Sequence, residues 1–434
     1  MQESELIVFR GGEQFELLSE VADLIHKYEI EKAAVAGADR ESMRKDLYRI
    51  INRLLEVAGH YGFHGNLWHC YLANFLVNHE NSYSCACEVR GEIEGTINQA
   101  VLHDIVFFKE LYDYDFTGMM EELQVPELAL VLDYKASSRE SKVYNTRICQ
   151  RICELAEKFC EDTTPEEMKA TLTQFYKEYG VGKFGLHKSF RVVHDEDGVH
   201  IQPILNIAHV ALDDLVGYEI PKKKLTDNTN AFVSGKKANN CLLFGDAGTG
   251  KSTCIKAIAN EYYGRGLRII EVYKHQFQDL NDVISQIKNR NYKFIIYMDD
   301  LSFEEFETEY KYLKAVIEGG LEKKPNNILI YATSNRRHLI RENFSDKEEI
   351  RQDMHTSDTV QEKLSLVYRF GVTIYFGSPN KKEFQTIVKT LAEKNGVTMG
   401  EEELLAEANK WELMHSGLSG RSAQQFIDYL LGMQ

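Results

Sequence analysis

The stretch CLLFGDAGTGKST (residues 241–253) decides the fold of the second half of this chain. Gly245, Gly250, Lys251 and Ser252 match the pattern G-x-x-x-x-G-K-[ST], in which backbone N–H groups surround phosphate oxygens at the N-terminus of a helix. The apolar run before the loop predicts a strand, and the helical spacing of the apolar residues after it predicts a helix. The stretch therefore predicts a site for nucleotide phosphates, and a glycine-rich turn without a ligand is the alternative.

Within this loop the lysine is expected to reach the terminal phosphates and the Ser252 hydroxyl to ligate Mg²⁺. The loop residues expected to contact the nucleotide are Asp246, Ala247, Gly248, Thr249, Gly250, Lys251, Ser252 and Thr253.

A second element of phosphate chemistry lies in FIIYMDD (residues 294–300), an apolar run that ends in two carboxylates. Asp299 is expected to share the magnesium ion with the phosphate loop. Asp300 occupies the place of a general base for the attacking water, with Glu304 and Glu305 as alternatives about one helical turn further on. Two acidic residues at a strand end can also be simple surface turn residues.

From about residue 211 onward, short apolar runs alternate with amphipathic helical patterns. This alternation predicts an α/β domain whose parallel sheet is covered by helices on both faces. After Pro379 only helical patterns remain, and they predict a small helical C-terminal domain.

The first part of the chain has a different character. Residues from about 15 to 180 show mainly helical periodicity, and Thr164, Pro165 and Glu167 predict a capped helix start. Two short runs of β type follow, joined by an Asp-Gly turn signal. We expect four parts: a mainly helical domain over residues 1–188, a β-hairpin linker over 189–210, the α/β nucleotide-binding domain over 211–378 and a helical lid over 379–434.

The 434 residues carry 51 Lys and Arg against 67 Asp and Glu, a net charge of -16. Long-range repulsion therefore disfavours a general nucleic-acid or anionic-membrane surface, although a local basic patch stays open. Apolar runs end far short of the roughly 18 residues of a membrane helix. A cytoplasmic protein without a membrane partner is the expectation.

The eight cysteines are scattered, and several fall in apolar helical patterns where reduced cysteines behave as small hydrophobes. SYSCACE (residues 82–88) suggests a metal, but no second ligand pair follows at the spacing of a structural zinc site. His103, Asp104, Tyr112 and Asp113 form a polar group along one predicted helix, for which core packing with polar edges is the favoured interpretation. Serine-hydrolase and HExxH motifs are absent from the sequence.

From about residue 212 to 434 these motifs, in this order, resemble the AAA+ superfamily of P-loop ATPases. The whole chain is similar to the bacterial family of predicted ATP-binding proteins known as domain of unknown function 815. The features that carry this closer resemblance include DDLVGYE, NNCLLFGDAGTGKST, MDDLSFEEFE, ATSNRRHL, QEKLSLVYRFG and GLSGRSAQQF.

The resemblance implies further roles. Asn335 corresponds to the polar sensor at a strand end. Arg369 corresponds to an arginine finger that acts in a neighbouring subunit, and Arg351 is a weaker candidate for that role. Arg421 corresponds to a second sensor in the lid. The segment expected beside adenine comprises Leu215, Val216, Gly217 and Tyr218. At position 300 this chain has an aspartate where the superfamily usually has a glutamate. This difference leaves the rate of hydrolysis open.

Together the motifs predict an Mg²⁺-dependent ATPase that acts as a homo-oligomer and remodels or regulates a protein partner. Two alternatives stay open. One is a nucleotide-operated scaffold or switch with negligible hydrolysis, and the other is a nucleic-acid-remodelling ATPase, for which Lys222–Lys224, Lys236, Lys237, Arg336 and Arg337 supply basic spots.

Overall fold

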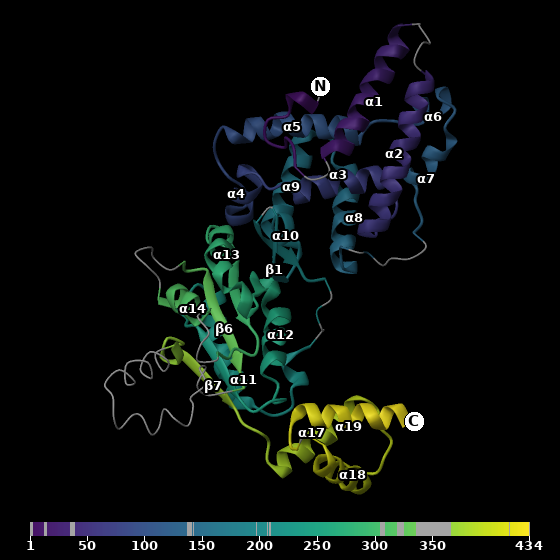
Figure 1. The fold of residues 1–434 in the computed structure, drawn as a ribbon. Coiled ribbons are helices and arrows are strands. Elements are labelled where there is room, and N and C mark those ends of the chain that lie inside the picture. Colours follow the sequence, from purple (N-terminus) through teal and green to yellow (C-terminus); the bar gives the residue numbers. More distant parts are fainter. Residues whose placement is uncertain are drawn as a thin grey trace. The chain divides into compact units, whose positions relative to one another are not determined.

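The computed structural model describes residues 3–12, 15–34, 40–136, 141, 143–196, 198–205, 207, 210–303, 309–318, 325–335, 366–415 and 417–433. They form two compact units, Met1–His187 and Lys188–Gln434 (Figure 1). Within the described ranges, no helix combines the length and the apolar character needed to cross a membrane.

The first unit is built from helices, as its periodicity predicts. Their bounds are α1 Phe15–Ala34, α2 Arg40–Tyr61, α3 Leu67–Asn78, α4 Ser82–Arg90, α5 Ile97–Tyr112, α6 Thr117–Glu122, α7 Ala129–Leu132, α8 Thr146–Glu161, α9 Pro165–Tyr179 and α10 Gly182–Leu186.

Helix α3 is the centre of this unit, because apolar side chains around nearly its whole circumference are buried. Asn66 caps its N-terminus, and α9 begins with the predicted capping box of Thr164 and Glu167. On α5, Asp104 is fully buried and accepts hydrogen bonds from the backbone N–H groups of Ile7, Val8 and Phe9 at 2.7 to 3.1 Å. The expectation that this polar group belongs to the core is confirmed for Asp104.

The second unit contains a sheet whose described strands follow the order β2-β1-β4-β5-β6-β3-β7. All neighbouring pairs are parallel except β1 with β2. The strands are β1 Ser189–Asp195, β2 Gly198–Pro203, β3 Cys241–Gly245, β4 Leu267–Glu271, β5 Lys293–Met298, β6 Ile328–Ser334 and β7 Val372–Phe376. The predicted α/β fold with a parallel sheet is therefore confirmed.

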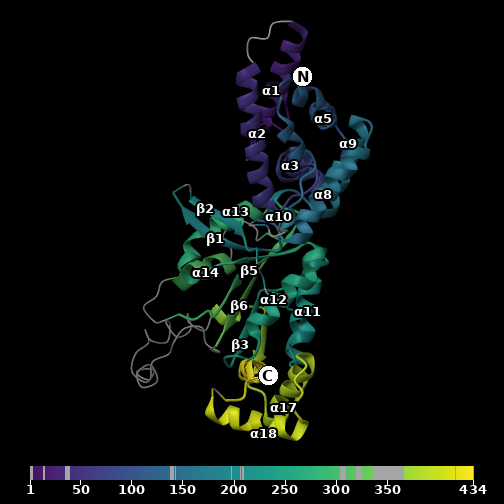
Figure 2. The ribbon, with the colours of Figure 1, turned by 90° about the vertical axis from the view of Figure 1, so that its right-hand side faces the viewer.

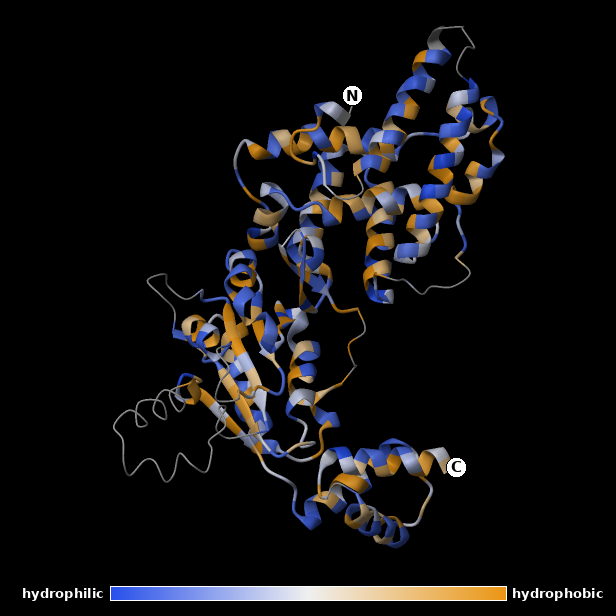
Figure 3. Cartoon of the chain, in the orientation of Figure 1, coloured by the Kyte–Doolittle hydropathy of each residue, from blue (hydrophilic) through white to orange (hydrophobic). Residues whose placement is uncertain are grey.

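Helices α11 Glu219–Val233 and α12 Lys251–Tyr262 lie on one face of this sheet, and α13 Leu280–Ile287 and α14 Glu309–Glu318 lie on the other (Figure 2). Side chains of successive strand residues point to opposite faces, so a strand covered on both faces is apolar throughout. The central strands β5 and β6 are buried almost from end to end, and Figure 3 shows the orange of apolar residues along the sheet.

The hairpin that we expected as a linker is part of the sheet. Its first strand pairs in parallel with β4, with Phe190 opposite Ile270, and its second strand pairs with the first from Phe190↔Pro203 to Asp195↔Gly198. Alternation within the hairpin buries Phe190, Val192 and Ile201, which explains why it adds to the edge of the sheet.

The chain ends in three helices, α17 Lys381–Lys394, α18 Glu401–Met414 and α19 Gly420–Met433. They share a core that includes Phe384, Val388, Ala423 and Ile427, and α17 begins with the capping box that Asn380 predicts. These helices therefore form a cluster with its own small core, in the segment where the helical lid was predicted.

Candidate nucleotide-binding site

The phosphate loop connects β3 to α12 and depends on three glycines with positive φ. These angles are 135° at Gly245, 73° at Gly248 and 90° at Gly250, and all three lie in the region that glycine adopts without steric cost. A Cβ at Gly245 would overlap the backbone carbonyl of Phe376 in β7, and one at Gly250 would overlap the side chain of Leu215. The loop therefore needs glycine both for its conformation and for close packing.

The side chain of Lys251 lies inside the loop and is almost fully buried. Its Nζ donates hydrogen bonds to the carbonyl oxygens of Gly245 at 2.9 Å and Asp246 at 2.6 Å. Burial lowers the pKa of this ammonium from its ordinary value, and the nearby carboxylates oppose that shift. The Lys251 ammonium is thus a desolvated cation held against the loop, and an anionic phosphate bound there would stabilise its charge.

The Asp299 carboxylate accepts hydrogen bonds from three hydroxyl groups. Its Oδ1 lies 2.7 Å from Ser252 Oγ, 2.6 Å from Tyr297 Oη and 2.6 Å from Thr333 Oγ1. Burial alone would raise the pKa of Asp299, but the hydroxyls of Thr333, Tyr297 and Ser252 lower it below its ordinary value. An ionised carboxylate beside a serine hydroxyl at the start of α12 offers the hard oxygen ligands that Mg²⁺ prefers, so these residues fit that ion.

Asp300 follows in an unusual backbone conformation, with φ 47°. Its N–H donates to Thr333 Oγ1 at 2.9 Å, and its Oδ1 accepts a 2.7 Å hydrogen bond from Nδ2 of Asn335. The residues predicted separately as base and sensor are thus in contact. This contact arises because β5 and β6 are parallel neighbours, which brings their C-terminal ends together.

Segment 215–218 lies between two apolar cores. Leu215 and Tyr218 pack against the core of the sheet, whereas Val216 packs against the core of the lid. The Tyr218 hydroxyl donates to the carbonyl of Gly377 at 3.1 Å, and its ring lies 5.4 Å from that of Phe376. This placement gives the expected adenine segment a fixed position beside the phosphate loop.

These elements enclose a cavity of about 700 Å³, which is large enough for a nucleotide. The predicted residues that line it are Leu215, Val216, Tyr218, Ala247, Gly248, Thr249, Gly250, Lys251, Ser252, Thr253, Asp299, Asp300, Asn335 and Arg421.

Gly217, Asp246 and Arg369 do not line this cavity. The Asp246 carboxylate instead accepts from the N–H and the hydroxyl of Ser378, at 2.7 and 2.8 Å, and these bonds lower its pKa. It therefore ties the phosphate loop to the segment after β7. Arg369 forms an ion pair with Glu318 of α14. Arg351, Glu304, Glu305, Arg336 and Arg337 fall outside the described residues.

The lid contacts the loop directly. Arg421 is in the first turn of α19, and its backbone N–H donates to the carbonyl of Gly248 at 3.1 Å. A Cβ at Gly248 would come within 3.0 Å of the Arg421 Cβ. The phosphate loop and the lid therefore pack closely at Gly248, and a larger side chain there would crowd Arg421.

Sequence reasoning missed several residues at this site. Thr333 and Tyr297 organise the Asp299 carboxylate, and Ile387, Leu391, Gln424 and Gln425 of the lid line the cavity. Thr333 in β6 stands two residues before Asn335, which directly follows that strand, and this spacing was the available signal.

Parts of this chain are similar to known proteins. Residues 186–434 match the model of the family described as "Protein of unknown function (DUF815)". Over 80 residues, 18% of the chain and 23% of the relative, the sequence is 35% identical to the replication factor C small subunit of Haloarcula marismortui.

Solved structures of RuvB from Thermotoga maritima are also similar. A mutant form is 18% identical with a TM-score of 0.37, covering 51% of this chain and 65% of that one. The structure titled as a Holliday junction branch migration motor is 15% identical with a TM-score of 0.32, covering 50% and 71%. The chain thus spans about a quarter of the length of the curated relative and less than two thirds of the RuvB mutant.

Proposed function

Because this chain belongs to the DUF815 family and has the AAA+ P-loop fold, we propose that it binds ATP with Mg²⁺ and hydrolyses the β–γ phosphoanhydride bond. The observation that carries the proposal is the 2.7 Å contact between Ser252 Oγ and Asp299 Oδ1, in the same cavity as Lys251 and Asp300. This contact unites the magnesium ligands of the phosphate loop and of β5.

Each side chain then has a distinct task. Lys251 places a positive charge against the phosphates, and Arg421 faces the same space from the lid. Asp300 accepts a proton from the attacking water, and the Asn335 amide orients the Asp300 carboxylate through its 2.7 Å hydrogen bond. Mg²⁺, when bound, supplies charge neutralisation at the β- and γ-phosphate oxygens.

We further propose a homo-oligomer in which Arg369 reaches the nucleotide of a neighbouring subunit, and a protein as the client that is remodelled. The net charge of -16 favours a protein client over nucleic acid. ATP-dependent assembly can be checked by light scattering with ATP and with ADP.

A second candidate is a nucleotide-operated switch with negligible turnover. The observation in its favour is the backbone hydrogen bond from Arg421 to Gly248, which would transmit occupancy of the phosphate loop to the lid without hydrolysis. The short side chain of Asp300 also supports this candidate.

Steady-state phosphate release with and without MgCl₂ separates the two candidates. The wild-type chain should release phosphate only with Mg²⁺, and Lys251→Ala should bind a fluorescent ATP analogue at least about tenfold more weakly. Lys256→Ala, which removes an exposed lysine from the same helix, is the matched control and should behave as wild type. Binding without Mg²⁺-dependent release would favour the switch, and failure to bind ATP would refute both.

A further inference from the structure

Several cysteine and histidine side chains lie where α3 packs against α8. The ligand atoms of His64, Cys149 and Cys153 lie close together and Cys70 lies next to Cys153, and we call these four residues the thiol–imidazole cluster. His64 lies just before α3, Cys70 is in its first turn, and Cys149 and Cys153 are one turn apart on α8. The cluster is confined to the first unit, so it is separate from the nucleotide site.

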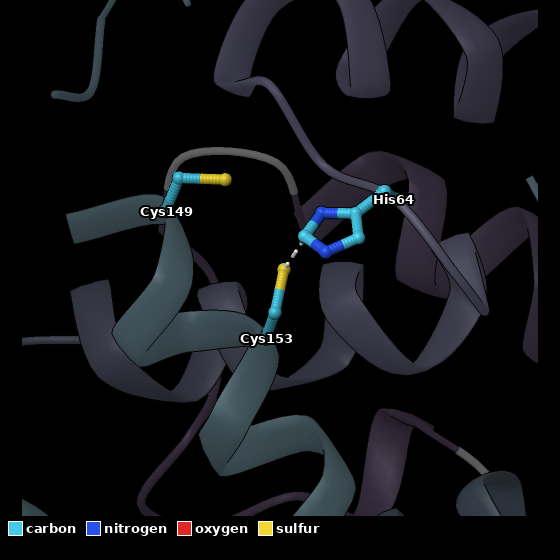
Figure 4. A group of neighbouring side chains, drawn as sticks. All are labelled: His64, Cys149 and Cys153. Carbon is cyan, nitrogen blue, oxygen red and sulfur yellow. Dashed lines mark hydrogen bonds between the residues drawn. The ribbon is translucent and has the colours of Figure 1, made fainter. Parts of the chain in front are cut away.

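The geometry of the cluster is close to that of a four-ligand metal site. The ligand atoms of His64, Cys149 and Cys153 all lie within 4.8 Å of one another, and Figure 4 shows the three side chains directed toward a common space. The Sγ atoms of Cys70 and Cys153 are 3.7 Å apart, and Cys153 Sγ is 3.8 Å from Nδ1 of His64. A tetrahedral zinc ion with Zn–S bonds of about 2.3 Å sets its sulfur ligands about 3.8 Å apart.

Burial also distinguishes these thiols. All three cysteines are buried, whereas His64 is partly accessible. The thiolate is the form of cysteine that binds metals. Cys149 and Cys70 donate to the carbonyls of Gly62 and His64, at 2.9 and 3.4 Å, and metal binding would release these protons.

We propose that the thiol–imidazole cluster binds one Zn²⁺ ion and that this ion fastens α3 to α8. Three sulfur ligands and one imidazole nitrogen favour a thiophilic tetrahedral ion over Mg²⁺ or Ca²⁺. Four protein ligands leave no open position, so the site is structural and stabilises the first unit. The ligands come from two distant segments of the sequence. Cys70 and Cys153 are 83 residues apart, and His64 and Cys153 are 89 residues apart.

The test titrates the reduced, chelator-treated full-length chain with Co²⁺, whose spectrum reports tetrahedral thiolate coordination. Wild type should take up about one equivalent, with thiolate-to-cobalt charge-transfer bands and strong visible bands that Zn²⁺ abolishes. Metal analysis of the protein purified without chelator should find about one zinc per chain. Absence of both the bands and bound zinc would overturn the proposal.

Variants connect the spectrum to the cluster. Cys149→Ser and Cys153→Ser should lose the bands, and Cys160→Ser, which removes an exposed thiol from the same α8 helix, should keep them. His64→Gln changes a partly exposed side chain and so provides a ligand variant that is expected to fold. Zn²⁺ should raise the melting temperature of wild type but not of His64→Gln.

The competing explanations give different results. If Cys160→Ser loses the bands as fully as Cys153→Ser, the metal binds elsewhere and the assignment is wrong. If the non-reduced protein has a mass lower by two hydrogens and takes up no metal once reduced, Cys70 and Cys153 form a disulfide and the zinc site does not exist. Buried thiols that only pack would show neither metal nor mass change, which also refutes the proposal.

Discussion

The side-chain amide of Asn335 donates a 2.7 Å hydrogen bond to Oδ1 of Asp300, which joins the ends of two neighbouring strands. One carboxylate oxygen of Asp300, whose φ is 47°, is thereby fixed beside Asp299, the proposed magnesium ligand. An aspartate with an otherwise short reach is thus held in a defined orientation. We expect this pair to act as one unit in hydrolysis.

Asp300→Asn should retain ATP binding and lose phosphate release by roughly 10² to 10⁴-fold, because the proton acceptor is removed. Asn335→Ala should cause a smaller loss. The double variant should be no slower than Asp300→Asn, since an orienting group has no effect once its target is inert. Additive losses in single-turnover assays would show that the two residues act separately, and unchanged turnover in Asp300→Asn would remove it as the base.

Thr333→Val should destabilise the chain by about 1 to 3 kcal/mol and slow hydrolysis. The buried hydroxyl donates to Asp299 and accepts from the N–H of Asp300, so its loss removes one of the three hydroxyl donors to the carboxylate and leaves the Asp300 N–H only its longer, 3.2 Å hydrogen bond to Asp299 Oδ1. Thr373→Val alters an exposed threonine of β7 and should stay within about 0.5 kcal/mol of wild type in urea unfolding. Equal stability of the two variants would mean that the Thr333 hydroxyl is dispensable.

Gly245→Ala should lower the free energy of unfolding by about 2 kcal/mol or more and abolish ATP binding. Its added methyl group would meet the carbonyl of Phe376, and its φ of 135° is unfavourable for alanine. Gly264→Ala is the control, because nothing lies within 4 Å of the position that its Cβ would occupy. Thermal melts and nucleotide titrations of both variants check this prediction, which a fully stable, ATP-binding Gly245→Ala would contradict.

The lowered pKa of Asp299 predicts how stability depends on pH. Its pKa in the folded chain is below the ordinary value of 3.8, so its contribution is fully present above that value and is lost as pH falls through the folded pKa. The wild-type chain should exceed Asp299→Asn in unfolding free energy at pH 7, and the difference should shrink toward pH 3. If this difference in unfolding free energy stays constant from pH 7 to pH 3, the hydroxyl cluster of Ser252, Tyr297 and Thr333 does not favour the ionised carboxylate.

Local signals made much of this structure predictable. The glycines of the phosphate loop, the apolar runs of β3 and β5 and the capping boxes at Thr164 and Asn380 each depend on residues within a few positions of one another. Secondary structure, strand direction and the phosphate loop therefore followed from the sequence. The role predicted for Arg369 still depends on a neighbouring subunit.

Tertiary structure alone decided which side chains from distant segments meet. The pairing of β1 with β4, the contacts of Thr333 and Asn335 with the two aspartates, and the convergence of His64 and Cys153 depend on strand order and helix packing. No periodicity along the chain encodes these contacts, because burying apolar surface rewards many helix and strand arrangements almost equally, and only complementary packing of the whole unit selects one. The sequence by itself thus determined the elements and the phosphate loop, and the packed fold determined the hydroxyl cluster around Asp299 and the candidate zinc ligands.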